Sequence, residues 1–202
     1  MSESLKWDQR YSEPGYAYGT DPNDFLKASL EYLPANGSVL CLAEGEGRNS
    51  VFLARRGFKV TAVDSSPVAM DKTQALAQKH GVQVTSIVAD LAEFTLEPNQ
   101  YDGIISIFCH LPIPIRKIVH SFIPKSLRND GIFLLEGYTP KQLEHSTGGP
   151  PIKELLMQLH VLQEELSGLE TIHGIELERE IHEGKLHNGL GAVVQYIGKK
   201  SK

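Results

Sequence analysis

The sequence predicts an α/β domain: a seven-stranded, mostly parallel sheet with helices on both faces and an antiparallel hairpin near its C-terminal end. Short apolar runs alternate with helical patterns over residues 38–137, and this alternation is typical of a parallel sheet. The runs are continuously apolar, as strands covered on both faces are. Residues 176–199 break the rhythm, because two strand-like runs lie either side of Asn188-Gly189, a pair that favours a hairpin turn.

Residues 1–37 form a cap segment of this same domain, not a linker, because aromatic side chains gather there among glycines and prolines. The aromatic residues are Trp7, Tyr11, Tyr16 and Tyr18. Asp24 is a candidate N-cap for a short helix beginning at Phe25, which Pro34 and Gly37 end.

The core elements follow in order along the chain. Strands are expected at 38–43, 59–63, 83–88, 102–109 and 131–137, and helices at 49–56, 67–80 and 113–127. Glycines at 57, 81 and 131 mark the exits of those helices. After Tyr138 we expect a loop and then one helix over 152–167, whose leucines fall on a single face.

Composition narrows the class of protein. A chain of 202 residues that is 41% hydrophobic can bury one substantial core, so we expect a single domain. Its net charge of −5 gives no broad attraction to nucleic acid or to anionic membranes, which favours a small-molecule substrate. No apolar stretch of signal-peptide or membrane-spanning length is present, so we expect a cytoplasmic protein. Cys41 and Cys109 are expected to be reduced core thiols, and nothing indicates an oligomeric state.

The turn after the first strand carries both glycines and carboxylates. A strand followed by Gly-x-Gly and a helix brings backbone close to a nucleotide. Here Glu44 and Glu46 flank Gly45, and Gly47 completes the pattern. A pyrophosphate at this turn would meet like charge, at about 4 kcal/mol per pair for an effective dielectric near 20. The turn therefore favours a cofactor that carries positive charge.

Further polar residues follow the next strands, and the carboxyl ends of parallel strands converge on one crevice. Asp64 is placed to accept ribose hydroxyls, with Ser65 and Ser66 beside it; its alternative role is a helix N-cap before Pro67. Asp90 is placed to accept the amino group of a base, and its alternative is a loop turn. Residues 107–110 end the fourth strand at the same edge.

These motifs together resemble the class I S-adenosylmethionine-dependent methyltransferases, a Rossmann-like family, over residues 38–199. Glu-x-Glu-Gly-Arg-Asn at 44–49, Trp-Asp-x-Arg-Tyr at 7–11, Tyr-Gly-x-x-Pro-Asn at 18–23 and Thr-Gly-Gly-Pro-Pro at 147–151 resemble the tellurite-resistance and thiopurine-type branch. The resemblance implies a methyltransferase domain at 38–202 and S-adenosylmethionine as cofactor. Position 49 is Asn where a third glycine is common, so Asn49 is a candidate cofactor contact.

The full set of expected cofactor contacts comes from the cap segment and from the four strand ends. It comprises Trp7, Tyr11, Tyr18, Glu44, Gly45, Glu46, Gly47, Arg48, Asn49, Asp64, Ser65, Ser66, Ala89, Asp90, Leu91, Ile107 and His110.

Several of these residues have a second interpretation. The three aromatic residues either close over the sulfonium, where a cation gains up to about 2 kcal/mol, or form the packed core of the cap. Arg48 either pairs with Glu44 or Asp90, or is a solvated arginine in the first turn of a helix. His110 either contacts substrate or only shapes a turn.

No obligatory catalytic residue is expected. A thiol or chalcogen oxyanion needs no general base, whereas for a hydroxyl or amine acceptor His110, Glu136 or Tyr138 would be candidates. The remaining histidines form no metal pattern, and His182 and His187 are expected to be exposed beside a hairpin turn, so no metal site is predicted.

We expect residues 7–20, 109–115 and 138–151 to roof the acceptor site, with the Gly-Gly-Pro-Pro segment at 148–151 as a hinge. Two other classes share the fold. One is a non-catalytic S-adenosylmethionine sensor, and the other is an NAD-dependent oxidoreductase, whose pyrophosphate the acidic turn would oppose.

Overall fold

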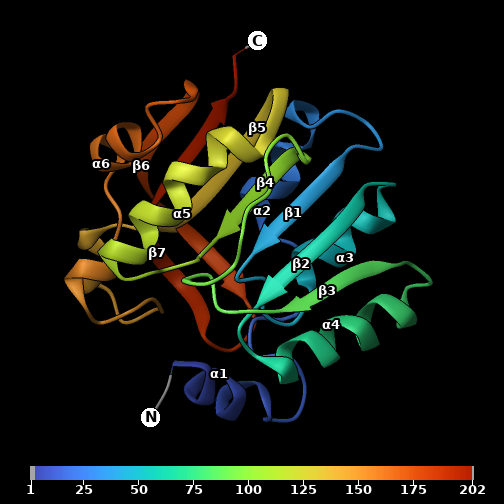
Figure 1. Cartoon of the computed structure of the whole chain (residues 1–202). Helices are drawn as coiled ribbons and strands as arrows, with labels where there is room; N and C mark the ends of the chain where they lie inside the picture. Colours follow the sequence, from blue (N-terminus) through green and yellow to red (C-terminus); the bar gives the residue numbers. More distant parts are fainter. Residues whose placement is uncertain (1–2, 202) are drawn as a thin grey trace.

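The fold is a single seven-stranded sheet with helices on both faces, as predicted (Figure 1). A computed structural model of the chain describes residues 3–201, so the first two residues of the predicted cap segment lie outside it. The strand order is β3-β2-β1-β4-β5-β7-β6. Strands β1 to β5 are parallel, and β7 runs antiparallel to both β5 and β6.

The elements have the following bounds. The strands are β1 Ser38–Leu42, β2 Lys59–Asp64, β3 Val84–Val88, β4 Tyr101–Ile107, β5 Leu127–Tyr138, β6 Glu170–Glu183 and β7 His187–Lys199. The α-helices are α1 Glu3–Tyr11, α2 Asp24–Ala28, α3 Arg48–Arg55, α4 Pro67–Lys79, α5 Ile113–Ser126 and α6 Leu159–Glu165. Three short 3-10 helices are η1 Leu30–Tyr32, η2 Pro140–Glu144 and η3 Lys153–Leu155.

The sheet separates two layers of core because side chains alternate along each strand. On β1, Val39 and Cys41 belong to one buried cluster with residues of α3 and α4, while Leu40 and Leu42 belong to a second cluster with residues of α5 and α6. Both cysteines are buried and unpaired, as expected. The centre of the sheet is thus covered on both faces, which is why its strands read as continuous apolar runs.

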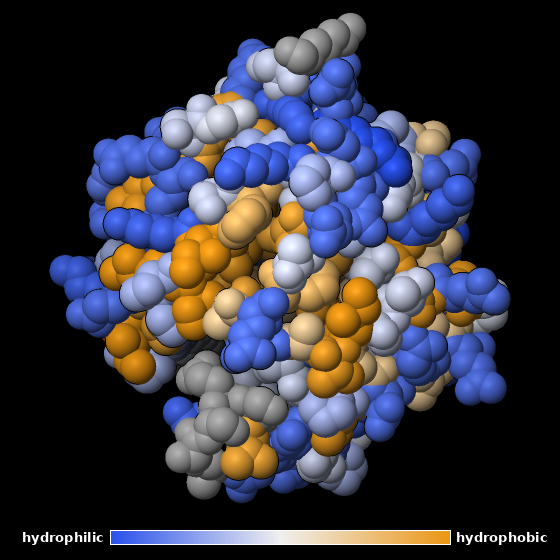
Figure 2. Space-filling model, viewed as in Figure 1, coloured by the Kyte–Doolittle hydropathy of each residue, from blue (hydrophilic) through white to orange (hydrophobic). Residues whose placement is uncertain are grey.

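The outer surface is mostly hydrophilic, with apolar patches on the face that carries α5 (Figure 2). On this helix Ile118 and Phe122 are exposed. Within residues 3–201, no helix has the length and apolar character needed to cross a membrane.

The prediction of a single helix over 152–167 is wrong. The structure has η3 and then α6, separated by an extended stretch around Met157. Met157 is 1% exposed, and its backbone N–H donates to the carbonyl of Tyr138 at 2.9 Å. Burial of Met157 against β5 therefore overrides the helical spacing of the neighbouring leucines.

The hairpin is present, but its turn lies at residues 184–186, and Asn188-Gly189 falls inside β7. Gly184 has φ +68° and packs so closely on the cap segment that an added Cβ would lie 2.5 Å from the backbone of Tyr18 and Gly19. The amide of Lys185 also donates to the carbonyl of Ala17. Contact with the cap segment thus places the turn, and it buries His187, which we had expected to be exposed.

Two smaller boundaries also differ from expectation. Helix α2 is capped by Asn23, whose side chain accepts from the amide of Leu26, so Asp24 is the first helical residue and not the cap. Strand β4 ends at Ile107, and the next residue, Phe108, has φ +52°. A non-glycine residue in this conformation is strained, and such residues gather at functional sites.

A buried charge cluster joins α5 to α6. Arg116 makes a bidentate ion pair with Glu165: its Nε donates to Oε2 at 3.0 Å and its Nη2 donates to Oε1 at 2.9 Å. His120 Nδ1 lies 2.7 Å from Glu165 Oε2, and the Glu165 side chain is 6% exposed. Burial opposes the charge of this carboxylate, but hydrogen bonds from His120 and Arg116 outweigh it and lower the pKa of Glu165 to about 2.

Glu165→Gln should lower the free energy of unfolding at pH 7 by about 2 to 3 kcal/mol, because it leaves the Arg116 guanidinium buried without its anion. A depressed carboxyl pKa contributes stability above the unfolded value, and that contribution is lost as the pH falls toward 2. Urea unfolding of wild type, Glu165→Gln and the exposed neighbour control Glu164→Gln from pH 7 to pH 3 measures this. Parallel curves for wild type and Glu165→Gln across that range would contradict it.

Candidate active site

The glycine turn follows β1 at the carboxyl end of the sheet, and its backbone needs glycine. Gly45 has φ +68° and Gly47 has φ +93°, a region that side chains disfavour. A Cβ added at Gly47 would lie 2.9 Å from the α-carbon of Thr73, and Thr73 Oγ1 donates to the carbonyl of Gly45 at 3.0 Å. Ala43, which starts the turn, also has a positive φ of 46°. Strained backbone therefore marks the ends of both β1 and β4.

Asp64 is the last residue of β2 and points at this turn. Its Oδ2 accepts from the amide of Gly45 at 2.9 Å, and its Oδ1 accepts from the amide of Ser66 at 2.9 Å. Burial raises the pKa of the carboxyl, opposed by these backbone N–H groups. A carboxylate offers about four lone-pair sites, so Asp64 keeps acceptor capacity after it has fixed the turn.

Glu44 is buried, and it serves the start of α3. Gly47, the N-cap residue, offers no side chain, and Glu44 Oε1 instead accepts from the amide of Ser50 at 2.6 Å. Burial raises the pKa of Glu44 to about 7, against the hydrogen bonds from Ser50. Near neutral pH this carboxyl is therefore only partly charged.

Glu46 binds the cap segment. Its Oε2 accepts from the amide of Ala17 at 2.6 Å, and its Oε1 pairs with Lys72 Nζ at 2.8 Å. Lys72 also donates to the carbonyl of Gly15 at 2.7 Å. Both acidic residues of the turn thus have partners within the chain, so the local negative charge is smaller than the sequence suggests.

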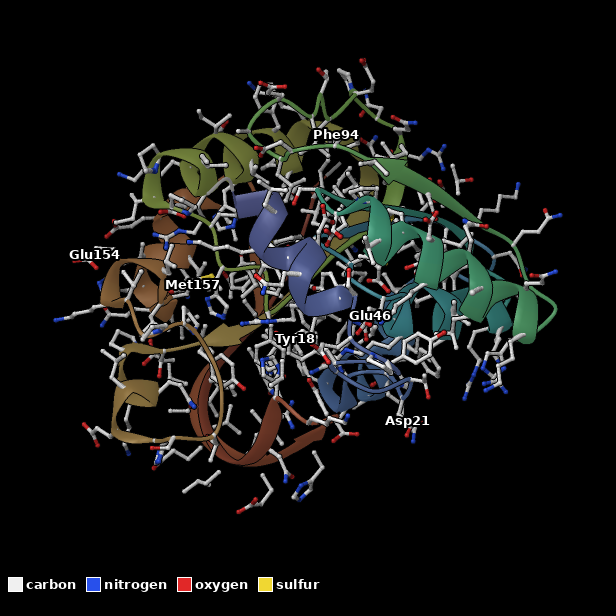
Figure 3. All side chains as sticks on the ribbon, turned by 90° about the horizontal axis from the view of Figure 1, so that it is seen from below. Tyr18, Asp21, Glu46, Phe94, Glu154 and Met157 are labelled. Atoms are coloured by element: carbon white, nitrogen blue, oxygen red, sulfur yellow. The ribbon has the colours of Figure 1, made fainter. Side chains whose placement is uncertain are left out.

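Helix α1 lies across the carboxyl ends of β1 and β2 (Figures 1 and 3). Tyr11 is 5% exposed, and its hydroxyl lies 3.0 Å from the position that a Cβ at Gly45 would take. Trp7 stacks on Tyr11 with ring centroids 5.5 Å apart, and Asp8 accepts from the Ser66 hydroxyl. In this structure α1 therefore covers the glycine turn, as a lid would.

The structure gives several other predicted contacts a role in the fold. Ser66 is the N-cap of α4 and accepts from the amide of Ala69, a role we had weighed for Asp64. Asn49 Oδ1 accepts from the amide of Asn23 at 2.9 Å. Arg48 Nη2 pairs with Glu183 at 2.7 Å, and neither predicted partner, Glu44 nor Asp90, makes this contact.

The residues after β3 line the same edge of the sheet. Asp90 is exposed and caps a turn by accepting from the amide of Ala92, while Leu91 is buried and Ala89 is half-buried. Ser65 is half-buried beside Asp64, and Ile107 is buried in the core. The apolar and acidic character needed to hold an adenine ring is present here.

His110 has both ring nitrogens occupied by backbone. Its Nδ1 lies 2.9 Å from the carbonyl of Leu155, and its Nε2 accepts from the amide of Tyr138 at 3.3 Å. Burial lowers the pKa of His110 to about 4. The ring is therefore neutral and has no nitrogen left for a substrate proton. Among residues 3–201, no group of three or more His, Cys, Asp or Glu side chains is placed to hold a metal ion.

Sequence reasoning missed the partners supplied by the hairpin and by α4. Glu183 pairs with Arg48 beside the turn, Lys72 pairs with Glu46, and the His187 ring lies against Tyr18 of the cap segment. They are distant in sequence from the glycine motif, so only the folded topology brings them together. Phe108 lies within residues 107–110, which we expected at this edge of the sheet, but it was not among the expected contacts.

The site fits S-adenosylmethionine in its donor and acceptor chemistry. Asp64 retains lone pairs for hydroxyl groups, Leu91 and Ala89 offer an apolar surface, and the glycine turn brings backbone to the surface under the lid. An open hollow of about 450 Å³ lies on the outer side of α1, between α1 and the β6–β7 turn, and is lined in part by Arg10 and Lys185.

Comparison with known proteins finds similar sequences over part of the chain. Residues 39–131 match the family model described as "Methyltransferase domain". One similar protein is the 2-heptyl-1-hydroxyquinolin-4(1H)-one methyltransferase of Mycobacteroides abscessus, 28% identical over 113 residues, which are 54% of this chain and 49% of that protein. Another is the ribosomal protein L11 methyltransferase of Dechloromonas aromatica, 28% identical over 137 residues, or 65% of this chain and 44% of that protein. The chain spans about half the length of these relatives.

Solved structures agree on the fold. A protein studied for the conversion of a disulfide bond into a thioacetal group in echinomycin biosynthesis has a TM-score of 0.80 at 16% identity, covering 99% of this chain and 92% of that one. TehB from Haemophilus influenzae has a TM-score of 0.71 at 16% identity, covering 98% and 67%. A SAM-dependent methyltransferase from Methanosarcina mazei has a TM-score of 0.67 at 18% identity, covering 90% and 99%. At these identities the likeness concerns the fold alone.

Lys72→Met should loosen α1, because the lysine joins Glu46 to the carbonyls of Glu13 and Gly15. We expect the amide of Ala17, which donates to Glu46, to exchange about tenfold faster with solvent deuterium, for a loss near 1.4 kcal/mol. Lys79→Met, at the exposed end of the same helix, is the control. Unchanged exchange at Ala17 would show that the lid is held without Lys72.

Proposed function

We propose that this chain uses S-adenosylmethionine to transfer a methyl group to a small-molecule nucleophile, because residues 39–131 match the methyltransferase family model and the fold is like that of a SAM-dependent methyltransferase. The observation that carries the proposal is the convergence of the glycine turn, Asp64 and the residues after β3 at one edge of the sheet beneath α1. Open α/β sheets bind their ligands at this edge.

The residues divide the work as follows. Asp64 would hold ribose hydroxyls, Ala89, Asp90 and Leu91 would hold the adenine, and the backbone of the glycine turn would lie along the methionine end. When bound, S-adenosylmethionine supplies a methyl group on a sulfonium, which is already an activated leaving group. The remaining task of the chain is to orient the acceptor and exclude water, and positioning contributes about 7 to 11 kcal/mol.

The state of His110 supports a mechanism without an obligatory base at that residue. Its ring is neutral and both of its nitrogens are engaged by backbone. A thiol ionises readily and a chalcogen oxyanion is already charged, so neither needs such a base. We therefore favour a thiol or a chalcogen oxyanion as the methyl acceptor. We also favour membership of the tellurite-resistance and thiopurine-type branch.

The glycine turn favours a positively charged cofactor over a pyrophosphate less strongly than the sequence predicts. Lys72 neutralises Glu46, and the pKa of Glu44 near 7 leaves that carboxyl partly protonated. Discrimination against a pyrophosphate cofactor would then depend on Asp64, whose carboxylate faces the amide of Gly45.

Binding of S-adenosylmethionine tests the cofactor assignment. Asp64→Asn should raise its Kd by about 10- to 150-fold, or 1.5 to 3 kcal/mol, because charge-assisted contacts to ribose are lost. Isothermal titration of wild type, Asp64→Asn and the exposed control Asp71→Asn measures this, with NAD as a second ligand. Equal affinity of wild type and Asp64→Asn would remove Asp64 from the site, and tighter binding of NAD than of S-adenosylmethionine would contradict the function.

Transfer of radiolabelled methyl groups tests catalysis itself. Purified protein with labelled S-adenosylmethionine should label at least one member of a panel of small thiols, selenite and tellurite. A protein that binds the cofactor yet labels none of a broad panel of small-molecule nucleophiles would instead be a sensor.

A further inference from the structure

Unpartnered polar atoms gather at one buried position beside the proposed cofactor turn. Within residues 3–201, the buried side-chain atoms without a hydrogen-bond partner are Arg48 Nη1, Arg116 Nη1, Tyr138 Oη, His173 Nε2 and His187 Nδ1. An unsatisfied buried donor costs about 1 to 3 kcal/mol, so each calls for an explanation. Three of these five belong to a single cluster: those of Arg48, Tyr138 and His187.

Distances through Glu183 establish the cluster. Arg48 Nη2 lies 2.7 Å from Glu183 Oε2, and the same oxygen lies 3.6 Å from His187 Nδ1, beyond hydrogen-bond distance. The His187 and Tyr138 rings have centroids 5.4 Å apart and stand at 89°. Arg48, His187 and the Tyr138 ring therefore border one spot beside the Glu183 carboxylate.

Aromatic rings wall this spot. Phe108 stacks on Tyr138 at 4.6 Å and meets the edge of His187 at 4.7 Å. The ring centroids of Tyr18 and His187 are 4.5 Å apart. Tyr18 is labelled beside Glu46 in the middle of Figure 3. Flat faces of this kind favour a planar group.

The spot lies at the carboxyl ends of β4 and β5, the edge at which open α/β sheets bind their ligands. Tyr138 is the last residue of β5, Phe108 follows β4, and Arg48 is the first residue of α3 after the glycine turn. The loop at 148–149 covers it: a Cβ at Gly148 would lie 2.8 Å from His187 and 3.1 Å from Tyr138 Oη. A Cβ at Gly149 would lie 2.8 Å from the Tyr138 ring. The two glycines let the loop close directly on the cluster.

The chemistry of the unpartnered atoms defines what they would bind. Arginine nitrogens only donate hydrogen bonds, and a tyrosine hydroxyl that stays protonated donates as well. Burial raises the pKa of Tyr138, so its hydroxyl keeps its proton at neutral pH. Glu183 is already held by Arg48 and Asn23, and Arg179 pairs with Glu136, so the charges nearby are balanced before any ligand enters.

We propose that Arg48 and Tyr138 donate hydrogen bonds to an anionic oxygen group of the methyl acceptor, which lies against Phe108, Tyr18 and His187 under the Gly148-Gly149 loop. This inference rests on the proposed function and names the acceptor class for the same site. The oxygen group belongs either to a planar organic acid or to a free inorganic oxyanion. The aromatic walls favour the organic acid.

Titration by ligand-observed NMR with benzoate, its uncharged counterpart benzamide, and selenite tests the proposal, with and without saturating S-adenosylhomocysteine. Benzoate should bind more tightly than benzamide, and Tyr138→Phe and Arg48→Lys should each weaken benzoate about tenfold. Tyr138→Phe should bind S-adenosylhomocysteine within about twofold of wild type. Selenite binding with the same sensitivity to both variants would support the subsite and assign it to an inorganic anion.

Two matched controls separate this role from general damage to the core. Tyr196→Phe also removes a buried tyrosine hydroxyl, and Arg116→Lys alters another buried arginine that has an unpartnered Nη1 and a glutamate partner. Neither should change benzoate binding. If Arg48→Lys does not fold, Tyr138→Phe, which keeps the ring, decides alone.

Equal binding of benzoate and benzamide, no anion binding, or benzoate binding that Tyr138→Phe leaves unchanged would overturn the subsite; the cluster would then hold a buried water. Failure of S-adenosylhomocysteine to bind would contradict the proposed function, while the titrations without it would still decide the subsite.

Discussion

The side chain of Asn23, fully buried, holds the cap segment, α3 and the hairpin in one arrangement. Its Nδ2 donates to Glu136 at 2.7 Å and to Glu183 at 2.8 Å, and its backbone amide donates to Asn49 at 2.9 Å. Glu183 in turn binds Arg48. Buried carboxylates are costly unless paired, so these contacts act together. The proposed acceptor subsite depends on this network, because it fixes Arg48 at the end of the glycine turn.

The fold was predictable from the sequence because its strands are covered on both faces and so appear as apolar runs. The failures share a cause: long-range contacts that local patterns do not record. Met157 packs against β5 and interrupts an apparent helix, and Gly184 packs on the cap segment and moves the hairpin turn away from Asn188-Gly189. At the candidate site, the motif was enough to locate the glycine turn. Its partners in the hairpin were not predictable in this way, because they lie far away in sequence: Glu183, which pairs with Arg48, follows it by more than 130 residues.

The carboxylates of the turn illustrate a limit of reasoning from charge alone. Glu44 and Glu46 have the sign expected for a site that attracts a cation, but Glu44 caps α3 and Glu46 binds Lys72 and the cap segment. Asp64 can both stabilise the turn and accept hydrogen bonds from a ligand, since it binds the amide of Gly45 and retains free lone pairs. In the proposed function, recognition of the cofactor would therefore depend on shape, on the backbone of the turn and on Asp64, with α1 as the cover.

A crystal structure with S-adenosylhomocysteine tests the central claim most directly. We predict that the ribose hydroxyls will lie on the carboxylate of Asp64, with the thioether near the glycine turn and the Arg48–Glu183 pair intact. A ligand found instead in the outer hollow beside Arg10 and Lys185, with Tyr11 still over Gly45, would contradict it.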